Sequence, residues 1–225
     1  SKSFMEQKIL DESHRLFTAQ GIHLFTMDDL AARLGISKKT LYRFYTSRQD
    51  LIAQVCQRIA DEYETTFEAV DRKDLNSIQR LLGYISAVIR FCKQITPSFF
   101  NDLRRNFPQQ WSELESLLER SVKDRMTRLL EQGVQQGYFR NNLHPSLVLA
   151  IWQQHIQRDF EFAASLVNDY SKDEVFRQAM YLFLYGVIAP DAISQLEAEL
   201  AAFKYNNTSL LTSPAANSAV GKKLN

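Results

Sequence analysis

The chain has few residues that interrupt helices and few that build cross-linked or metal-bound scaffolds. Its 225 residues include seven glycines and five prolines, and no stretch alternates polar and apolar residues as a half-buried strand does. Its two cysteines, Cys56 and Cys92, stand among apolar residues, which predicts buried reduced thiols instead of a disulfide framework. Its four histidines lack the spacing of a zinc site. The sequence therefore predicts an all-α protein with no metal and no cofactor.

Long apolar runs and a secretory leader are also missing. No apolar stretch reaches the length needed to span a membrane, and no segment has the pattern of a signal peptide. Acid, base and nucleophile residues are scattered along the chain, whereas an enzyme needs them clustered. We expect a cytoplasmic protein that is not an enzyme and that has no membrane partner.

Acidic residues are absent from Leu30 to Gln49, and this absence is the most informative feature of the chain. Residues 1–60 carry nine basic and six acidic side chains, and the remainder carries 18 basic and 20 acidic ones. A basic head on a mildly acidic body is typical of a DNA-binding domain joined to a domain with another task. A single exposed lysine is ordinary. The acid-free run, however, contains five cations: Arg33, Lys38, Lys39, Arg43 and Arg48.

Two short helices around a tight turn are predicted within this segment. Thr26 followed by Asp29 has the spacing of a capping box, which marks a helix start. Gly35 stands where a helix commonly ends in a left-handed residue, and Ser37 can cap a helix over Lys38–Tyr45. Helix, turn and helix thus fit within about twenty residues, as a helix-turn-helix motif requires.

The second short helix is expected to read DNA with its outer side. Leu41 and Tyr45 lie four residues apart and face inward, and Ser47 with Asp50 repeats the capping spacing at the next helix. Lysine and arginine can bond guanine edges, and threonine can contact a base edge or a thymine methyl group. A phenol and a guanidinium suit the phosphates on either side of the groove. The residues expected to contact DNA are Thr26, Ser37, Lys38, Lys39, Thr40, Tyr42, Arg43 and Arg48.

These residues resemble the N-terminal domain of the tetracycline-repressor (TetR-type) family of bacterial regulators. The resemblance extends from about Ile9 to Ile52, with a first helix that ends at Gly21. It implies a three-helix helix-turn-helix DNA-binding domain over residues 1–50, followed by a helical-bundle effector-binding and dimerisation domain over 51–205. The residues that match the family pattern are Thr26, Leu30-Ala31, Gly35-Ile36-Ser37, Thr40-Leu41-Tyr42, Tyr45, Ser47-Arg48 and Leu51.

The chain departs from the family pattern on the same helix. Phe44 stands where many members carry a histidine that touches DNA, Lys39 replaces a small residue, and Arg43 replaces an aromatic one. Arg48 in place of lysine keeps a cation. We expect this protein to bind an operator different from those of other members, through a helix with more positive charge than is usual in the family.

Helical periodicity continues to about residue 205. A long fourth helix is marked by Leu51, Val55, Ile59, Tyr63 and Phe67, at a spacing of four residues. The tail over residues 206–225, rich in Asn, Ser, Thr and Ala, is expected to be flexible. The further helices are expected over 75–96, 98–106, from Pro108 to Gly137, 145–168, from Ser171 to Ala189, and 191–205.

Two of these helices carry more apolar surface than a monomer needs. The helix over 145–168 has two apolar stripes, and the following helix is apolar nearly all round from Ala179 to Ala189. A partner subunit explains the surplus, as a four-helix interface of a homodimer, and full burial within one chain is the alternative. The family resemblance implies dimerisation through these last long helices. The expected interface residues are Leu149, Trp152, Ile156, Phe160, Met180, Phe183, Leu184 and Val187.

Aromatic residues are dense between Phe91 and Trp111. Rings on short helices suit a concave pocket for a small molecule, and ordinary core packing explains them equally well. The resemblance implies a cavity in this region for a small apolar or amphipathic effector, whose identity differs between members. The candidate lining residues are Phe99, Phe100, Leu103, Phe107, Trp111, Met126 and His155.

The sequence thus predicts a DNA-binding transcriptional regulator. The resemblance implies a ligand-responsive homodimeric repressor on a palindromic operator, although the residues themselves do not distinguish a repressor from an activator. The alternative is a helix-turn-helix protein that a protein partner controls, with no small-molecule effector. Such a protein would expose an apolar patch in place of an enclosed cavity.

Overall fold

The computed structural model describes residues 3–152 and 172–206, and over these residues the protein is helical. Apart from helices, a single bridge between Phe139 and Ile188 is the extended pairing found in this part of the chain. The predicted all-α fold is confirmed.

The chain forms two compact units. Residues 1–74 and 82–122 make the first unit, and residues 75–81 with those from 123 onward make the second. Two helices, α5 (Ser77–Gln94) and α7 (Pro108–Gln135), contribute to both. The helix α4 (Arg48–Asp71) packs on α1 (Phe4–Gln20) inside the first unit. The units therefore separate elsewhere than the expected boundary after residue 50, and a DNA-binding domain over 1–50 stays a prediction.

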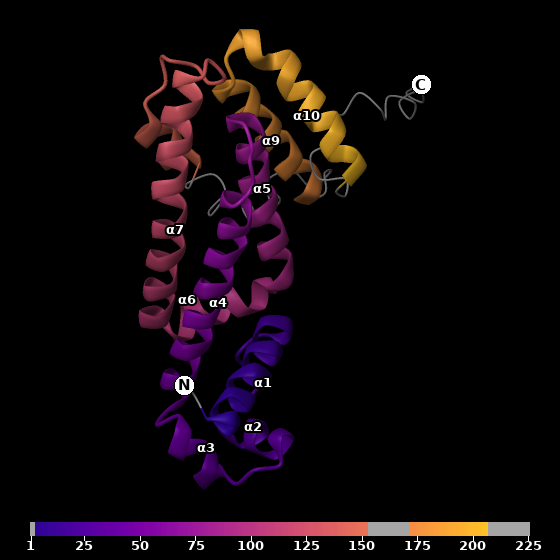
Figure 1. Cartoon of the computed structure of the whole chain (residues 1–225). Coiled ribbons are helices and arrows are strands. Elements are labelled where there is room, and N and C mark those ends of the chain that lie inside the picture. Colours follow the sequence, from indigo (N-terminus) through magenta and orange to yellow (C-terminus); the bar gives the residue numbers. More distant parts are fainter. Residues whose placement is uncertain (1–2, 153–171, 207–225) are drawn as a thin grey trace, which may run out of the picture. The chain divides into compact units, whose positions relative to one another are not determined.

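The first unit begins with a cluster of α1, α2 (Met27–Leu34) and α3 (Lys38–Phe44), from which α4 leaves (Figure 1). Its core is formed by apolar side chains from all four helices, among them Phe17, Leu30, Leu41 and Ile52, none more than 1% exposed. The first helix ends at Gly21, as expected, where φ is 99°. Burial of these side chains holds the short helices together, since isolated helices of this length are marginal in water.

The predicted caps of α2 and α3 are confirmed. Thr26 Oγ1 accepts a hydrogen bond from the Asp29 amide at 3.1 Å, and the Asp29 carboxylate accepts one from the Thr26 amide at 2.8 Å. Gly35 is left-handed with φ 67°, and Ser37 Oγ accepts from the Thr40 amide at 3.0 Å. Each device acts within four residues, so the sequence alone identifies it.

Only one of the two hydrogen bonds expected at the cap of α4 is formed. Ser47 Oγ accepts from the Asp50 amide at 3.0 Å, as predicted. The Asp50 carboxylate, however, accepts from the Thr46 amide at 2.9 Å instead of the Ser47 amide. The reciprocal capping box predicted here is therefore wrong, because the chain before α4 turns Thr46 toward the carboxylate.

The rest of the first unit packs around aromatic side chains. The predicted apolar stripe of α4 is buried along its length, and Tyr63 meets Phe67 and Phe91 with ring centroids 4.9 and 4.6 Å apart. Cys56 is a free, buried thiol, as predicted, and burial raises its pKa to about 12. The side chain of Cys92 lies outside the described residues.

The second unit contains α9 (Lys172–Val187), the short η1 (Pro190–Ala192), α10 (Ile193–Asn206) and a helix that begins at Pro145. The segment after α7 meets the end of α9, where the Arg140 amide donates to Val187 O at 3.0 Å and the Ala189 amide to Tyr138 O at 2.9 Å. The predicted cap Ser171 and the tail from 207 lie outside the described residues. None of the described helices has the length and apolar character that crossing a membrane requires.

Candidate nucleic-acid interface

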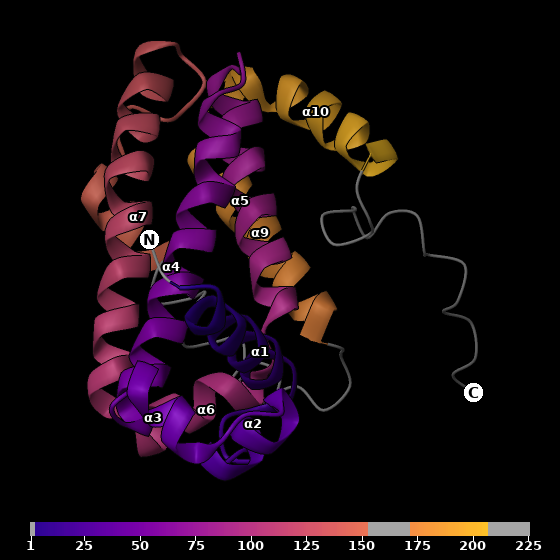
Figure 2. The same ribbon diagram turned by 60° about the horizontal axis from the view of Figure 1, so that its bottom comes forward.

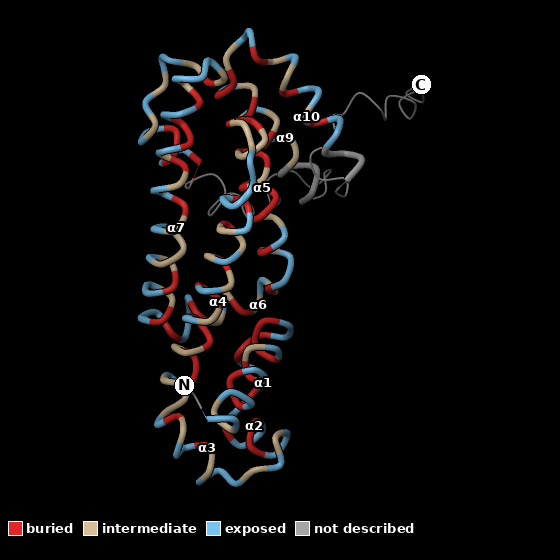
Figure 3. Tube along the Cα trace, viewed as in Figure 1, coloured by how far each residue is buried: buried red, intermediate tan, exposed pale blue. Residues whose placement is uncertain are grey.

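The outer side of α3 is polar and positively charged, and its inner side is apolar. Leu41 is fully buried and Tyr45, just after the helix, is 1% exposed. Lys38, Lys39 and Arg43 are all exposed, and we refer to these three as the cationic face. Exposed residues follow the outer sides of α2 and α3 (Figure 3). When the cluster is turned forward, α2 and α3 lie next to each other (Figure 2). This is the side that a helix-turn-helix presents to a major groove.

The hydroxyl residues of the predicted contact set already have partners. Thr26 Oγ1 lies 2.6 Å from Asp29 Oδ2, and the hydroxyl groups of Ser37 and Thr40 lie 2.8 Å apart. These side chains therefore stabilise the helix starts, and a hydroxyl group can still accept a further bond. Tyr42 is 38% exposed, so its phenol is accessible.

An acidic neighbour that the acid-free run did not reveal lies beside the cationic face. Asp28 in α2 pairs with Lys38, with Oδ1 and Nζ 2.8 Å apart, and this contact raises the pKa of Lys38. Both side chains are more than half exposed, so the pair contributes little to stability. Its consequence is electrostatic, because Asp28 compensates one of the three cations of the cationic face.

Arg48 makes contacts inside the protein in addition to the phosphate contact that the sequence predicts. Its Nη2 donates to the carbonyl oxygens of Ile22 and Phe25, both at 2.8 Å, and its guanidinium stacks over the ring of Phe107 at 5.5 Å. Both protons of Nη2 are thus used inside the protein. In this structure Arg48 holds the chain between α1 and α2, and a phosphate contact by its remaining N–H groups stays a prediction.

The position of α3 is also supported from α1. The hydroxyl group of Tyr45 donates to the carbonyl oxygen of Glu6 at 3.1 Å, and burial raises the pKa of this phenol to about 12. A buried tyrosine ring with a satisfied hydroxyl group fixes the end of α3 in direction as well as in distance.

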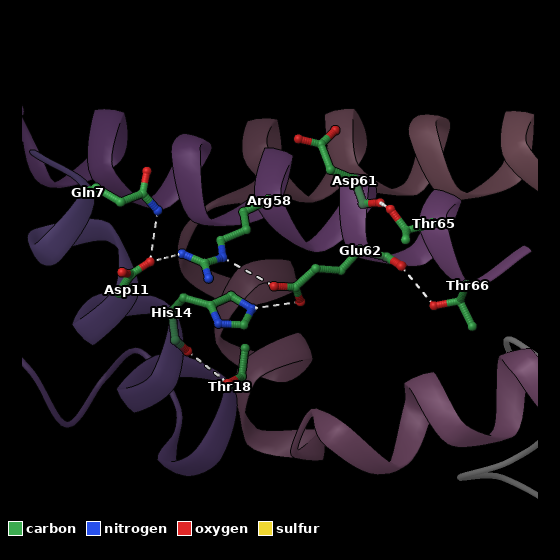
Figure 4. Close-up of polar contacts among 9 residues, drawn as sticks. All are labelled: Gln7, Asp11, His14, Thr18, Arg58, Asp61, Glu62, Thr65 and Thr66. Atoms are coloured by element: carbon green, nitrogen blue, oxygen red, sulfur yellow. Dashed lines mark hydrogen bonds and ion pairs between the residues drawn. The ribbon is translucent and has the colours of Figure 1, made fainter. Parts of the chain in front are cut away.

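A cluster of charged side chains joins α1 to α4 (Figure 4). His14 Nε2 lies 3.1 Å from Glu62 Oε2, and Glu62 Oε1 accepts from Arg58 Nε at 3.1 Å. Arg58 also pairs with Asp11, which Gln7 contacts at 2.8 Å. Burial is the largest influence on the His14 pKa and lowers it below the usual 6.5, while Glu62 opposes this shift. The cluster therefore fixes α1, and with it the base of α3, on the long helix.

Similarity to known proteins agrees with this geometry. A family model described as bacterial regulatory proteins of the tetR family matches residues 9–55, which include α2, α3 and the start of α4. An uncharacterized HTH-type transcriptional regulator of Bacillus subtilis, YvaF, is 25% identical over 188 residues, which are 83% of this chain and 97% of that protein. Residues 9–55 thus match the DNA-binding domain of the TetR family, and most of the chain is similar to an HTH-type transcriptional regulator.

Solved structures of the family share the fold over most of the chain. A TetR/AcrR-family regulator from Thermobifida fusca aligns with a TM-score of 0.62 at 24% identity, covering 82% of this chain and 98% of that one. A regulator from Marinobacter aquaeolei aligns with a TM-score of 0.65 at 16% identity, covering 88% and 99%. Both of these solved proteins are described as transcriptional regulators. The described residues bring together no group of His, Cys, Asp and Glu that would hold a metal ion.

The seven candidate pocket residues do not all lie in the same part of the structure. Phe99 and Leu103 of α6 (Pro97–Asn106) are fully buried, and Phe100 packs edge-on against Phe99 and Trp111. Phe107 carries the stacked Arg48. Met126 is buried in the second unit and His155 lies outside the described residues. The first unit thus brings together five of the seven, Phe99, Phe100, Leu103, Phe107 and Trp111, and a pocket stays a prediction.

Five of the eight residues expected at a dimer interface are buried within a single chain, which the sequence analysis did not expect. Leu149, Trp152, Met180, Leu184 and Val187 are each at most 7% exposed within a single chain. Phe183 packs on Trp152 with ring centroids 4.3 Å apart, and Ile156 and Phe160 lie outside the described residues. These five described residues therefore belong to the core of the second unit. Among the described residues of the 145 helix and α9, the large apolar side chains that remain exposed are Leu147, Ile151 and Leu182, at 59, 56 and 73%. We refer to these three as the apolar face.

The members of the apolar face lie on one side of a helix pair. The pairing of residues 138–140 with 187–189 places the start of the 145 helix and the end of α9 together. At about 1.5 Å per residue, Trp152 lies roughly 10 Å from the start of the 145 helix, and Phe183 lies roughly 6 Å from the end of α9. Because these rings are in contact, the two helices run antiparallel. In an antiparallel pair the residues that precede two contacting residues project to the same side, so Ile151 and Leu182 do so, with Leu147 one turn earlier.

Proposed function

We propose that the protein is a homodimeric, ligand-responsive repressor that binds a palindromic DNA operator. The observation that carries this proposal is the cationic face on α3, exposed on a helix whose opposite side is fully buried. Such a helix enters a major groove with its polar side toward the base edges. In the proposal Lys39, Thr40 and Arg43 contact bases, and Tyr42 and Lys38 contact phosphates.

A second copy of the chain is the proposed partner of the apolar face. Three large apolar side chains at more than half exposure on one side of a helix pair are unusual for a monomer. Ala179, one turn before Leu182, is small and exposed, which permits a second helix pair to approach closely. Two helix pairs related by a two-fold axis would form a four-helix interface with Leu147, Ile151 and Leu182 at its centre.

The proposed effector is a small apolar or amphipathic molecule that binds among the rings around α6. A dimer with two recognition helices would read two half-sites about 34–36 Å apart, or somewhat wider. An effector that favours another spacing of these helices would release the DNA. A coupling of ~1–3 kcal/mol, roughly 5- to 150-fold in affinity, is sufficient for such a switch.

Selection of binding sites from a randomised duplex library tests the proposal. We expect the purified full-length protein to enrich a palindrome whose half-sites are about one helical turn or more apart. The selected duplex then serves to screen small molecules for release of the DNA. Failure to enrich any sequence over competitor DNA would overturn the DNA-reading assignment. Enrichment of an asymmetric single site by a monomeric protein would overturn the dimer, and the apolar face would then serve a different protein partner.

A further inference from the structure

The segment between α1 and α2 is held by two ionised side chains of opposite sign. Oδ2 of Asp102, in α6, accepts hydrogen bonds from the amides of Ile22 at 2.7 Å and His23 at 2.9 Å. Nη2 of Arg48, at the start of α4, donates to the carbonyl oxygens of Ile22 and Phe25. The carboxylate thus accepts hydrogen bonds from N–H groups of the segment, and the guanidinium donates hydrogen bonds to its C=O groups. We refer to Asp102 and Arg48 together as the loop clamp.

Asp102 is well suited to hold backbone amides. Its side chain is 13% exposed, and His23 Nδ1 adds a third contact at 2.8 Å to the same oxygen. Burial raises the pKa of Asp102, but the hydrogen bonds from His23 and Ile22 outweigh it and leave the pKa below the usual 3.8. The carboxylate is therefore ionised at neutral pH. Charge-assisted bonds of this kind are roughly twice as strong as those between neutral groups.

The fit between α6 and the segment is close. Gly21 has φ 99°, and a Cβ atom on it would lie 2.5 Å from Ser98 Oγ and 3.0 Å from Asp102 Oδ2. Just before α6, the Thr96 amide donates to the carbonyl oxygen of Thr18, near the end of α1, at 2.8 Å. A glycine is needed here on two grounds, because other residues rarely adopt this φ and their side chains would displace α6.

The held segment leads directly into the reading helices. Phe25 is buried against Phe17, with ring centroids 6.3 Å apart, and Thr26 caps α2. The second member of the clamp, Arg48, is the first residue of the helix after α3. The start of α2 and the end of the helix-turn-helix are thus tied to one short stretch of backbone.

We propose that Asp102 is a positioning residue for DNA reading: it fixes the backbone of Ile22 and His23 so that α2 and α3 keep the orientation in which α3 meets base edges. This inference rests on the proposed function and extends it to a residue outside the helix-turn-helix. Asp102 itself touches no DNA. Since Phe99 and Leu103 lie on the same helix, any shift of α6 acts on the segment through this carboxylate.

The sign of the expected effect separates positioning from simple electrostatics. Removal of an acidic side chain near a DNA-binding surface weakens its repulsion of phosphates, so charge alone predicts tighter binding to every duplex. Positioning predicts the opposite for the selected operator, and no weakening for unrelated DNA, because the phosphate contacts of the cations remain. The ratio of operator affinity to affinity for unrelated DNA is therefore the decisive quantity.

The experiment compares full-length variants on the selected operator and on a scrambled duplex. We expect Asp102→Asn and Gly21→Ala to weaken operator binding about tenfold or more, within the range of coupling energies between contacting residues. Binding to the scrambled duplex should not weaken. Gly21→Ala changes no charge, so the same result for both variants excludes an electrostatic cause. The matched control is Asn101→Ala, exposed on the same helix, which should stay within about twofold of the wild type.

His23→Ala is the milder second variant, because it removes the ring contact and leaves both amide bonds. We expect it to weaken operator binding by a smaller factor in the same direction, and to have no additional effect in the Asp102→Asn background. It keeps the inference open to refutation if the other variants fail to fold. Amide hydrogen exchange of the free proteins should be faster at residues 22 and 23 in Asp102→Asn.

The outcomes distinguish this inference from the proposed function. A wild-type protein that prefers an operator, with variants that keep the same affinity ratio, overturns the positioning role alone. Tighter binding of Asp102→Asn to both duplexes also overturns it, in favour of charge. A wild-type protein that prefers no duplex overturns the proposed function and this inference together.

Discussion

The regulator exposes two surfaces of opposite chemistry, and they differ in how they are built. The cationic face on α3 is polar, and its positions can be read from the sequence as a run without acids. The apolar face on the 145 helix and α9 lies among many other apolar residues, and most of the described side chains predicted at a dimer interface belong to the core. A charged surface can thus be recognised in the sequence by the absence of opposite charges. An apolar surface can be recognised only once the structure shows which apolar residues the core buries.

The supports of the two surfaces differ as well. α3 is fixed by polar contacts, namely Tyr45 on the Glu6 carbonyl and the ion-pair cluster between α1 and α4. The apolar face depends on shape, because Phe139 packs on Gly133 and thereby allows 138–140 to pair with the end of α9. The first surface should therefore respond to salt and pH, and the second to changes of side-chain volume.

The largest expected effect is the salt dependence of DNA binding. If the dimer neutralises roughly 6–10 phosphates, affinity should fall about 10³–10⁵-fold between about 50 and 200 mM salt. Lys38→Ala should reduce the salt slope by about one for each phosphate that the variant no longer neutralises. Lys123→Ala, exposed on α7, is the matched control and should leave the slope unchanged. Fluorescence anisotropy over a salt series measures this, and a salt-insensitive complex contradicts the assignment.

The next largest effect concerns the apolar face. In a dimer, two copies of Leu182 at ~1.5–3 kcal/mol each would contribute roughly 3–6 kcal/mol, so Leu182→Glu should weaken dimerisation about 10²–10⁴-fold. Ala202→Glu, exposed on α10, introduces the same charge elsewhere and should leave the dimer intact. Analytical ultracentrifugation distinguishes the two. Equal dimer affinity for Leu182→Glu and the wild type would show that another surface pairs.

Volume should matter where the apolar face is supported. A Cβ atom at Gly133 would lie 2.2 Å from the Phe139 ring, so Gly133→Ala should destabilise the protein by ~1–3 kcal/mol. At Gly186 in α9 a Cβ atom meets nothing within 4 Å, and Gly186→Ala should be neutral or slightly stabilising. Urea unfolding measures both. Equal stability of the two variants would mean that the ring moves aside without cost.

The smallest effect is the pH response of the cluster that supports α3. The His14 pKa is lowered in the folded state, chiefly by burial, so the unfolded chain binds the proton more readily. The contribution of His14 to stability is therefore fully present above pH 6.5 and decreases as the pH falls below that value. Thermal unfolding between about pH 7.5 and about pH 5 measures this decrease, and His14→Gln should make it less steep. A wild-type profile that is already flat in this range contradicts the prediction.

The local features of the fold could be predicted because each depends on neighbours within four residues. The caps at Thr26, Ser37 and Ser47 and the left-handed Gly35 are of this kind. Family resemblance located α3, and the inward side of α3 followed from the spacing of Leu41 and Tyr45. The same reasoning succeeded for α4, where a single apolar stripe leaves one choice of inner side.

The remaining features depend on partners far along the chain. Arg48 was expected on a phosphate, but its acceptors are carbonyl groups more than twenty residues away, and no local pattern identifies them. Asp102 has no recognisable signal in the sequence, since its amide donors lie about eighty residues earlier. On the 145 helix both stripes are apolar, and the side that is buried depends on Phe183 in the next helix. Periodicity shows which residues share one side of a helix. The position of the neighbouring helix in the same chain determines which of two apolar sides is buried.

The single fully buried side chain of α3 has an evolutionary consequence. Of the seven residues of this helix only Leu41 belongs to the core, and the caps on either side depend on Ser37 and Ser47. Substitutions at positions 39 and 43 therefore alter what the helix reads at little cost to folding, because surface changes away from such features typically stay within about 0.5 kcal/mol. Duplicated genes for this protein could acquire new target sequences through a few changes on one helix side. Libraries randomised there should yield mostly folded proteins.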